Sequence, residues 1–488
     1  MSAGGVRGLC PSTERHYSSA GDDAGQAIQD MNSKYQIDMC SGPLLGKIVL
    51  FAVPMILSGI LQLLFNASDL IVLGQFASHD AMAAVGVTGT LSALIVTVFI
   101  GLSIGTNVLA ATYFGARDNE GLHRTVHTSM AVSFICGLVV AGLTLLVSRP
   151  VLIAMGTPPG LLPMAYRYMW ICSIGMPFLI VYNFGSAVLR SIGDTRRPLY
   201  YLVAGGVINI LLNLVLVIFL HWDVDGVAVA TVLAQAISAS LIIRALCQEQ
   251  GASHLAWRHL AIDRQILRKM MLIGLPAGLQ GSFFAISNMT IQSSINSFGE
   301  LCIAGNTSAG SLEGIVYVAS YCMHQTAISF VGQNLGGRQY RRIRQSICWC
   351  MVIGFAILTA SGWGAYLLAN PLLNIFNSNP EVNQWGVMRM RILFTSYGLC
   401  ALMDVVSGGL RGLGHSLLPA VITMIGVCVL RVFWVVCIFP LNHSLTNLML
   451  SYPVSWILTA GVNGALLIWY CRKLPREDFA VNAGTGGA

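Results

Sequence analysis

Three acidic residues lie inside long apolar stretches of this sequence. Asp69, Glu313 and Asp404 interrupt runs of mainly apolar residues, whereas the other 17 of the 20 acidic residues lie in tails, loops or the ends of such runs. A charge at the centre of a bilayer costs about 2.5–3.5 kcal/mol on insertion scales. If these runs cross a membrane, each of the three carboxylates is a candidate site for an ion or a charged ligand.

Asp69 ends a polar stripe that begins at Ser58. Gln62 and Asn66 lie between them, and spacings of four, four and three residues place all four side chains on one face of a helix. A carboxylate on such a face can take up an ion on one side of a membrane and release it on the other, if access alternates. The alternative is a buried polar contact between helices.

Glu313 begins a second stripe. Tyr317, Tyr321 and His324 follow it by four, eight and eleven residues, so a carboxylate, two phenols and an imidazole share one helical face. This set can line a path for a proton or a cationic ligand. It can equally form a hydrogen-bonded cluster between helices.

Asp404 has a positive residue on its own helical face. Arg411 follows it by seven residues, so Asp404 is either a site residue or the partner of an arginine at the helix end. Arg431 lies deep in another apolar run and is expected to act as an internal counter-charge. Two groups of amides can coordinate a cation, hold a ligand or pair between helices: Asn209 and Asn213, and Gln280, Asn288 and Gln292.

The composition indicates a membrane protein. Of 488 residues, 55% are hydrophobic and only 10% are charged, with a mean hydropathy of +0.71, while soluble domains carry about 25% charged residues. The net charge of +7 comes from basic residues in short loops between apolar runs, which argues against nucleic acid as a partner. The 13 cysteines form no zinc-type ligand set and no disulfide framework, so we expect no metal and no cofactor other than a transported ion.

Twelve runs contain the roughly 20 mainly apolar residues that a membrane-spanning helix needs. They cover residues 44–73, 81–114, 124–147, 161–187, 197–220, 225–246, 267–296, 301–335, 345–368, 384–408, 416–440 and 446–471.

The second half of the sequence repeats the first at a constant offset. "VLRSIGDTRRPL", from Val188, and "GLRGLGHSLLPA", from Gly409, share Leu, Arg, Gly and Pro in register, and the same register pairs Gly115 with Gly336 and Arg117 with Arg338. A period of roughly 220 residues indicates a duplicated half rather than a solenoid. We therefore expect an all-α polytopic membrane protein with twelve transmembrane helices as two pseudo-symmetric six-helix bundles.

The repeat also predicts the domain boundaries. They are a disordered N-terminal tail (1–40), a first six-helix bundle (41–246), a cytoplasmic linker (247–265), a second bundle (266–471) and a C-terminal tail (472–488). Residues 1–30 have no apolar h-region and are therefore not a secretory signal, and Met31 is an alternative start.

Basic residues fall mainly on one side of the predicted bundles. With the N-terminus inside, 22 of the 27 Lys and Arg residues lie in cytoplasmic segments. This asymmetry predicts a multi-pass protein of the plasma (inner) membrane with both termini in the cytoplasm and a symmetry axis along the membrane normal. Arg190 and Arg411 are then expected to stay in water as topology anchors, with a gating role as the alternative. Arg389 is expected near an outer helix start.

Residues 31–473 resemble the MATE family of multidrug and toxic compound extrusion transporters. The resemblance rests on "PMILSGILQLLFNASDLIVLGQF", "VLRSIGDTRRPL", "NILLNLVLVIF", "VDGVAVATVLAQ" and "GGLRGLGHS", in this order. It implies two six-helix bundles around a central cavity that opens alternately to the two sides of the lipid bilayer. It also implies export of amphiphilic, often cationic small molecules, driven by a proton or sodium gradient, by a functional monomer.

The resemblance assigns roles to several residues. Asp69 falls on the family's first-helix acid, and Pro54 matches a proline at which that helix bends in some members. Asn213 stands where some proton-coupled members have an acidic residue in the fifth helix. The seventh helix has only amides, whereas norfloxacin-type members have a glutamate there. Asp404 lies about one turn from the position of the family's tenth-helix acid. The chain looks closest to the DinF-like branch. We expect the coupling ion, a proton or sodium, at Asp69 with Asn66, Asn209 and Asn213.

The same residues suggest two alternative functions. Lipid-linked saccharide flippases share this architecture and carry phosphates, which a cavity with several arginines would favour, but Arg431 is the one clear mid-helix arginine. A membrane-embedded aspartyl protease would use Asp69 and Asp404, but neither lies in a GxGD segment. HExxH, GxSxG and P-loop patterns are also missing from the sequence, so we do not expect an enzyme.

Overall fold

The computed structural model describes residues 35–475, and this range folds into helices without β-strands. The chain divides into two units, Met1–Gln36 and Ile37–Ala488, and every helix discussed below belongs to the second unit. The predictions made for residues 1–30 and Met31 concern a part of the chain outside the described residues.

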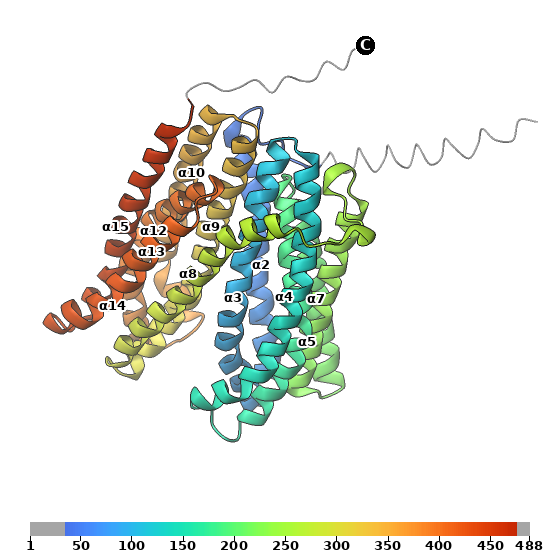
Figure 1. The fold of residues 1–488 in the computed structure, drawn as a ribbon. Coiled ribbons are helices and arrows are strands. Elements are labelled where there is room, and N and C mark those ends of the chain that lie inside the picture. The colour runs from blue at the N-terminus through green and yellow to red at the C-terminus, as the bar shows by residue number, and fades with distance from the viewer. Residues whose placement is uncertain (1–34, 476–488) are drawn as a thin grey trace, which may run out of the picture. The chain divides into compact units, whose positions relative to one another are not determined.

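Each half of the chain forms the same succession of helices (Figure 1). The first half consists of α2 (Leu44–Phe76), α3 (His79–Gly115), α4 (Asn119–Ala154), α5 (Leu162–Ser191), α6 (Arg196–Asn213) with its π-helical continuation η1 (Leu214–Phe219), and α7 (Asp223–Gln248). The 3₁₀ turns η2 (Gly251–Ser253) and η3 (Trp257–His259) lead to the second half.

The second half follows this order with more breaks. It consists of α8 (Arg264–Asn296), α9 (Glu300–Gly336), α10 (Tyr340–Leu367) with α11 (Ala369–Asn374), α12 (Pro380–Gly412), the run α13 (Leu417–Thr423), η4 (Met424–Val429), α14 (Leu430–Phe433), η5 (Trp434–Ile438) and η6 (Phe439–Leu441), and α15 (Leu445–Lys473). The predicted fold class, an all-α protein built from two equivalent sets of six helices, is confirmed.

The repeat is visible in the backbone of the turns. Arg117 and Arg338, which the repeat pairs, both adopt left-handed conformations, with φ of 56° and 55°. Gly193 and Gly414, paired in the same register, have φ of 95° and 85°. Left-handed backbone is uncommon outside glycine, so its recurrence at an arginine shows that the two halves use the same turn geometry.

Helix starts on both sides of the repeat are fixed by side-chain caps. Ser78, Asp118, Asn379 and Ser444 each accept a hydrogen bond from a main-chain N–H in the first turn of the following helix. Asp263 does the same for α8, and the N–H groups of Ile266 and Gln265 hold the pKa of this partly exposed carboxyl below its usual value.

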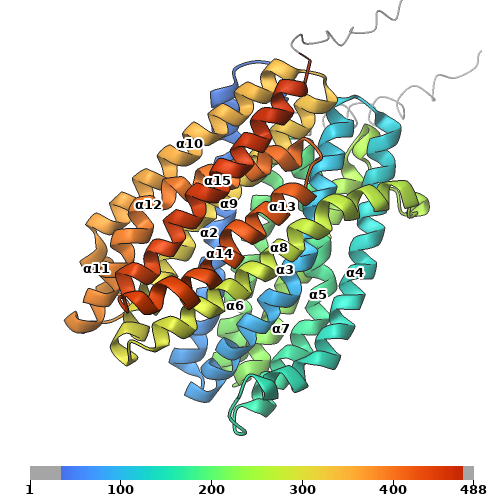
Figure 2. The same cartoon turned by 60° about the vertical axis from the view of Figure 1, so that its left-hand side comes forward.

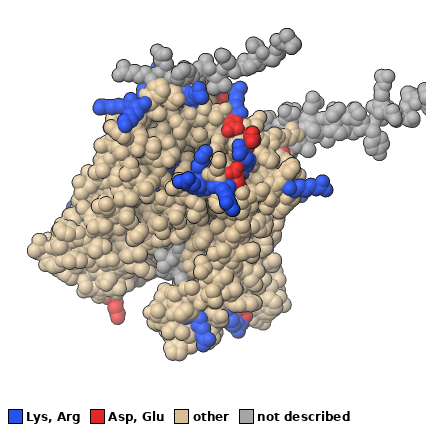
Figure 3. Space-filling view, viewed as in Figure 1, with Lys and Arg blue, Asp and Glu red and all other residues tan. Residues whose placement is uncertain are grey.

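Eleven of the twelve helical segments in the described range are long and apolar enough to cross a membrane. The twelfth, α9, is 37 residues long but carries many polar side chains, and it packs against α2, α3, α10 and α12. Figure 3 shows Lys and Arg gathered mainly at one end of the molecule, a few charged residues at the opposite end, and an almost uncharged surface between them. This surface is typical of a polytopic membrane protein.

The two halves meet where glycines let helices touch. Gly101 and Gly105 of α3 face Gly274 and Gly278 of α8, and a Cβ atom on Gly101 would lie 2.2 Å from the Cα atom of Gly278. Both pairs have the GxxxG spacing that allows close helix crossings in membranes. Figures 1 and 2 both show α3 and α8 side by side across the boundary between the halves.

A second contact between the halves lies near the ends of α3 and α9. A Cβ atom on Gly115 would lie 1.9 Å from the main-chain oxygen of Gln333, and one on Gly336 would lie 1.9 Å from that of Thr112. These helices finish at the end of the molecule that also holds the C-terminal ends of α5 and α12, which we call the basic end. Below the α3–α8 crossing the halves separate (Figure 1), so the contacts join them toward the basic end.

A buried charge cluster holds the turn after α5. Arg197 forms ion pairs with Asp194 and Glu249, and the three side chains are at most 8% exposed. The cluster connects the repeated stretch at Val188 with the end of α7. Breaking a buried pair leaves an uncompensated charge, which typically costs about 3–5 kcal/mol.

Arg197→Ala is therefore expected to lower the free energy of unfolding by about 3–5 kcal/mol, because Asp194 and Glu249 lose their common cation. Thermal unfolding of the purified protein in detergent measures this. The matched control is Arg196→Ala, the neighbouring arginine, which is only half-buried and has no ion pair among the described residues. Equal melting temperatures for the two variants would contradict a structural role of the cluster.

Candidate functional site

Asp69 is buried inside the first half among polar groups of α6 and α7. Its Oδ1 atom accepts a hydrogen bond from Nδ2 of Asn213 at 2.6 Å, and its Oδ2 atom accepts one from Thr231 at 3.4 Å. Asn209 donates to Thr231 at 3.4 Å and accepts a bond of the same length from Asn213. The structure thus brings together Asp69, Asn209 and Asn213, which the sequence named for one ion site.

This cluster opens into a small pocket. Asp69, Gln62, Asn66 and Asn209 line a cavity of about 100 Å³ between α2, α5, α6 and α7. None of the ion pairs in residues 35–475 involves Asp69, so its carboxylate has hydrogen-bond partners but no neighbouring cation. A carboxylate in this position can bind a proton or a cation without first breaking a salt bridge.

Pro54, the predicted hinge, is buried in α2 about four turns before Asp69, counting from the helix geometry. The helix runs through it without interruption, and Ser58 donates to the Pro54 carbonyl at 2.8 Å. Pro276 takes the equivalent place in α8. The hinge remains a prediction.

Glu313 lies in the second half and is paired. It forms an ion pair with Arg389 of α12, whose Nε donates at 3.1 Å, and Arg389 also donates to Asn306. Arg389 is the tenth residue of α12, in the first third of the helix, but its side chain is buried in the second bundle. A charge inside the bilayer is retained there because it has a partner of opposite sign.

The remaining stripe residues connect α9 to the end of α12. The Nδ1 atom of His324 lies 2.7 Å from the main-chain oxygen of Asp404, and its Nε2 atom lies 3.0 Å from Nη1 of Arg411. A carbonyl oxygen only accepts, so Nδ1 carries the proton and Nε2 accepts from Arg411. These two bonds hold His324 in its neutral form. Tyr321 stacks beside it with ring centroids 6.5 Å apart.

Asp404 and Arg411 are buried close to His324 without pairing with each other. The Asp404 carboxylate accepts a hydrogen bond from Ser320 at 2.7 Å, and Arg411 donates to Gln280 of α8 at 2.6 Å. No ion pair among the described residues joins Asp404 to Arg411. Arg411 is 4% exposed, so the expectation that it stays in water is wrong.

Three larger cavities carry most of the other predicted residues. One of about 510 Å³ lies between α2, α5 and α9 and is lined by Gln62, Asn66, Arg190, Tyr317 and Tyr321. One of about 420 Å³ reaches from Gln62 across to the second half, at Gln280, Tyr317, Tyr321, His324, Asp404 and Arg411. One of about 430 Å³ lies inside the second half, at Asn288, Gln292, Glu313, Tyr317, Arg389 and Arg431.

Tyr317 lines all three cavities, and Gln62 lines two of them and the pocket at Asp69. The predicted residues therefore do not form one compact site. They form an acidic pocket in the first half, a charged cavity in the second, and a polar passage between the halves.

The sequence gives no site signal for Thr231 or Ser320, and it places two of the cavity arginines in loops. Thr231 at Asp69 and Ser320 at Asp404 are single polar residues in apolar helices and resemble packing groups. Arg190 and Arg411 were assigned to loops because each stands one to three residues before a turn glycine. A signal was available for Arg389, which falls inside the predicted span 384–408.

The two halves also correspond separately to one protein family. The MatE family model matches residues 54–215 and again residues 276–436. The chain belongs to the MatE family. The second match follows the first in the register of the internal repeat.

Relatives and solved structures agree with this family. The chain is 25% identical over 426 residues to a probable multidrug resistance protein, YoeA, of Bacillus subtilis (strain 168), covering 84% of this chain and 90% of that protein. It is 28% identical over 239 residues to DNA damage-inducible protein F of Escherichia coli (strain K12), covering 46% and 52%. A crystal structure of MATE in complex with MaL6 has the same fold, with a TM-score of 0.83, 23% identity and coverage of 89% and 98%. The resemblance to the MATE family is confirmed.

The ion pair of the second half generates a stability prediction. Glu313→Gln is expected to lower the free energy of unfolding by about 3–5 kcal/mol, because Arg389 keeps its charge and loses its only carboxylate. The double variant with Arg389→Gln is expected to recover much of this loss, because no buried charge remains. Thermal unfolding in detergent measures both.

The matched control is Glu381→Gln, an exposed acid in the first turn of α12. If Glu313→Gln and Glu381→Gln unfold at the same temperature, the buried pair contributes nothing to stability. If the single variant Glu313→Gln and the double variant with Arg389→Gln both melt and export normally, the residues from Glu313 to His324 contribute only to helix packing.

Proposed function

We propose that this MatE family transporter is a cation-coupled antiporter that exports amphiphilic compounds by alternating access, with a proton or sodium ion coupled at Asp69. It acts as a monomer with no enzymatic activity of its own. The observation that carries the proposal is the position of Asp69: a carboxylate buried in a membrane bundle, surrounded by neutral donors and acceptors, with no cation paired to it.

The chemistry of this pocket suits a small cation. An ionised carboxylate is unfavourable in a dehydrated bundle, so Asp69 gains from binding a proton or a metal cation when it is closed off from water. The Oδ1 atom of Asn213 is buried and accepts no hydrogen bond from the described residues. Together with the oxygens of Asp69, Asn209 and Thr231 it supplies a set of hard oxygen ligands, while protonation needs Asp69 alone.

The second requirement of the proposal is access from one side at a time. The halves touch through glycine backbones toward the basic end, while cavities lie between them and inside each half. Basic loops remain on the cytoplasmic side in membrane proteins. On this assignment both termini lie in the cytoplasm and the structure represents the state closed to the cytoplasm.

Lipid-linked saccharide transport remains the second candidate. It gains from the arginines that line the cavities, Arg190, Arg389 and Arg411 in addition to Arg431. However, Arg389 is neutralised by Glu313, and cavities of about 420–510 Å³ are in the range of single small-molecule sites. Small-molecule export is therefore the better-supported function.

Asp69→Asn is expected to fold and insert but to lose gradient-driven transport by at least about tenfold, because the amide cannot change its charge. The measurement is dye uptake into inside-out vesicles, with proton and sodium gradients imposed separately and with ethidium and rhodamine 110 as substrates. Asp80→Asn, an exposed acid in the first turn of α3, is the matched control. Transport at the normal rate in Asp69→Asn would refute coupling at this residue, and a strict sodium requirement in the unaltered protein would exclude the proton.

The orientation can be tested with single cysteines at opposite ends. In a background lacking the exposed Cys348 and Cys437, Asn379→Cys should react with a membrane-impermeant maleimide in intact cells, and Asn119→Cys should react only after permeabilisation. Both positions are exposed at helix starts. The reverse pattern would place the termini outside.

A further inference from the structure

The second half contains a buried guanidinium that no carboxylate neutralises. Arg431 of α14 is 5% exposed, and its Nε donates to the hydroxyl of Ser455 at 3.2 Å. Its Cζ atom lies 4.0 Å from the centre of the Tyr452 ring. None of the ion pairs within residues 35–475 includes Arg431, so it is not the internal counter-charge that the sequence suggested.

The cavity in front of Arg431 keeps a positive charge. Three charged side chains line this space of about 430 Å³: Glu313, Arg389 and Arg431. Arg389 is bound to Glu313 through two of its nitrogens and to Asn306 through the third, which leaves that pair neutral. The lining therefore has a formal charge of +1, carried by Arg431, in a place where an uncompensated charge is costly.

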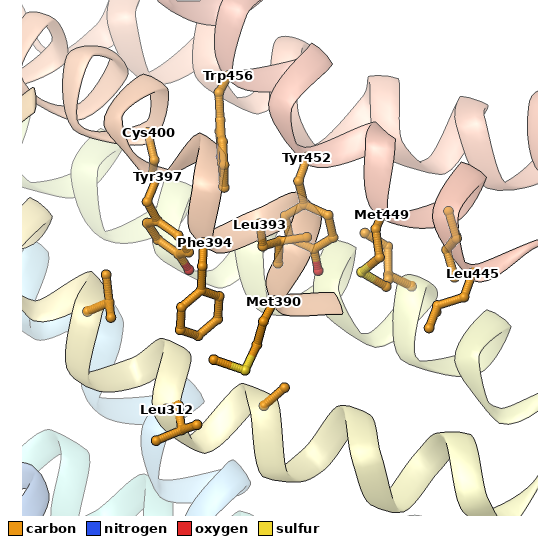
Figure 4. Packing of buried hydrophobic residues seen from close by; sticks show 14 of the residues in the cluster. Leu312, Met390, Leu393, Phe394, Tyr397, Cys400, Leu445, Met449, Tyr452 and Trp456 are labelled. Atoms are coloured by element: carbon orange, nitrogen blue, oxygen red, sulfur yellow. The ribbon is translucent and has the colours of Figure 1, made fainter. Parts of the chain in front are cut away.

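The other residues that line this cavity indicate which kind of ligand body it can hold. Tyr397 of α12 and Tyr452 and Trp456 of α15 form an aromatic wall, with ring centroids of Trp456 at 5.4 Å from Tyr397 and 6.0 Å from Tyr452. Figure 4 shows these three side chains converging from the two helices. Asn288 and Gln292 of α8 line the same cavity with polar groups. Such a wall accommodates a planar, largely apolar group.

We propose that this cavity binds the anionic group, a carboxylate or a phosphate, of a soluble amphiphilic substrate whose aromatic body packs on Tyr397, Tyr452 and Trp456. The proposal rests on the export function proposed above and specifies its substrate class. The terminal nitrogens of Arg431 make no hydrogen bond to the described residues and present a planar pair of donors, which matches a carboxylate or phosphate. A carboxylate, with one negative charge, would bring the formal charge of the lining to zero.

A matched pair of dyes tests the proposal without transport. Rhodamine 110 has a free carboxylate, and rhodamine 123 is its methyl ester, so the two differ in this group on one xanthene body. Fluorescence polarisation with the purified, full-length protein in detergent is expected to show rhodamine 110 binding about tenfold tighter or more, the size expected for charge-assisted hydrogen bonds. Equal binding of the two dyes would overturn the proposal.

Variants assign the preference to Arg431. Arg431→Gln is expected to abolish the preference for rhodamine 110 and to leave rhodamine 123 unchanged, while Arg431→Lys retains part of it. Arg391→Gln, which removes an exposed arginine of α12, is the matched control and should behave as the unaltered protein. A preference that survives Arg431→Gln would place the anion elsewhere. Because this readout is equilibrium binding, its failure leaves the Asp69 transport result untouched, and the reverse also holds.

Competition separates the two sources of an anionic group. Phenyl phosphate, a soluble aromatic anion, is expected to displace bound rhodamine 110. Displacement by dioctanoyl phosphatidylglycerol but not by phenyl phosphate would overturn the soluble substrate and assign the cavity to a lipid headgroup.

Discussion

The cost of placing charge in a bilayer governs the interior of this protein. Where the described helices bury a charge for structure, a partner of opposite sign accompanies it, as Glu313 does for Arg389. Asp69 and Arg431 depart from this pattern, since neither belongs to an ion pair of the described residues, and Asp404 and Arg411 are also buried without one. A mobile ion or a ligand can neutralise a charge that folding leaves without a partner. The proposals of a coupling ion at Asp69 and of an anionic ligand at Arg431 both follow from this.

The two halves share a backbone and differ in these charges. In the register of the repeat, Asp69 corresponds to Ile291 and Arg431 to Ile210. The first half therefore has a negative charge at Asp69, and the second half a positive charge at Arg431, that the equivalent position of the other half lacks. Duplication supplied a common frame of helices and turns, and the chemistry then diverged inside it.

The sequence was sufficient to predict the helices and their repeat, but not most of the contacts between side chains of different helices. Apolar runs and the register of the repeat predict the helices, because membrane crossing and duplication both leave periodic, local signals. The sequence also predicts the cluster of Asp69 with Asn209 and Asn213, because polar side chains inside a membrane bundle hydrogen-bond to one another across helices. The pairing of Glu313 with Arg389 joins residues 76 positions apart on different helices, and no local pattern encodes it. The glycine crossing was equally hidden, because the chain has 51 glycines and only packing shows which four touch.

The polar character of α9 has a consequence for how the protein is made. Unlike the other eleven segments, this helix is not apolar enough to partition into lipid by itself, and in the folded protein it is covered by α2, α3, α10 and α12. A ribosome delivers α2 and α3 well before α9, but α10 and α12 after it. We therefore expect α9 to stay beside α2 and α3 during synthesis until its later neighbours emerge. Insertion of the second half would then depend on the first, although each half has the helices of a complete bundle.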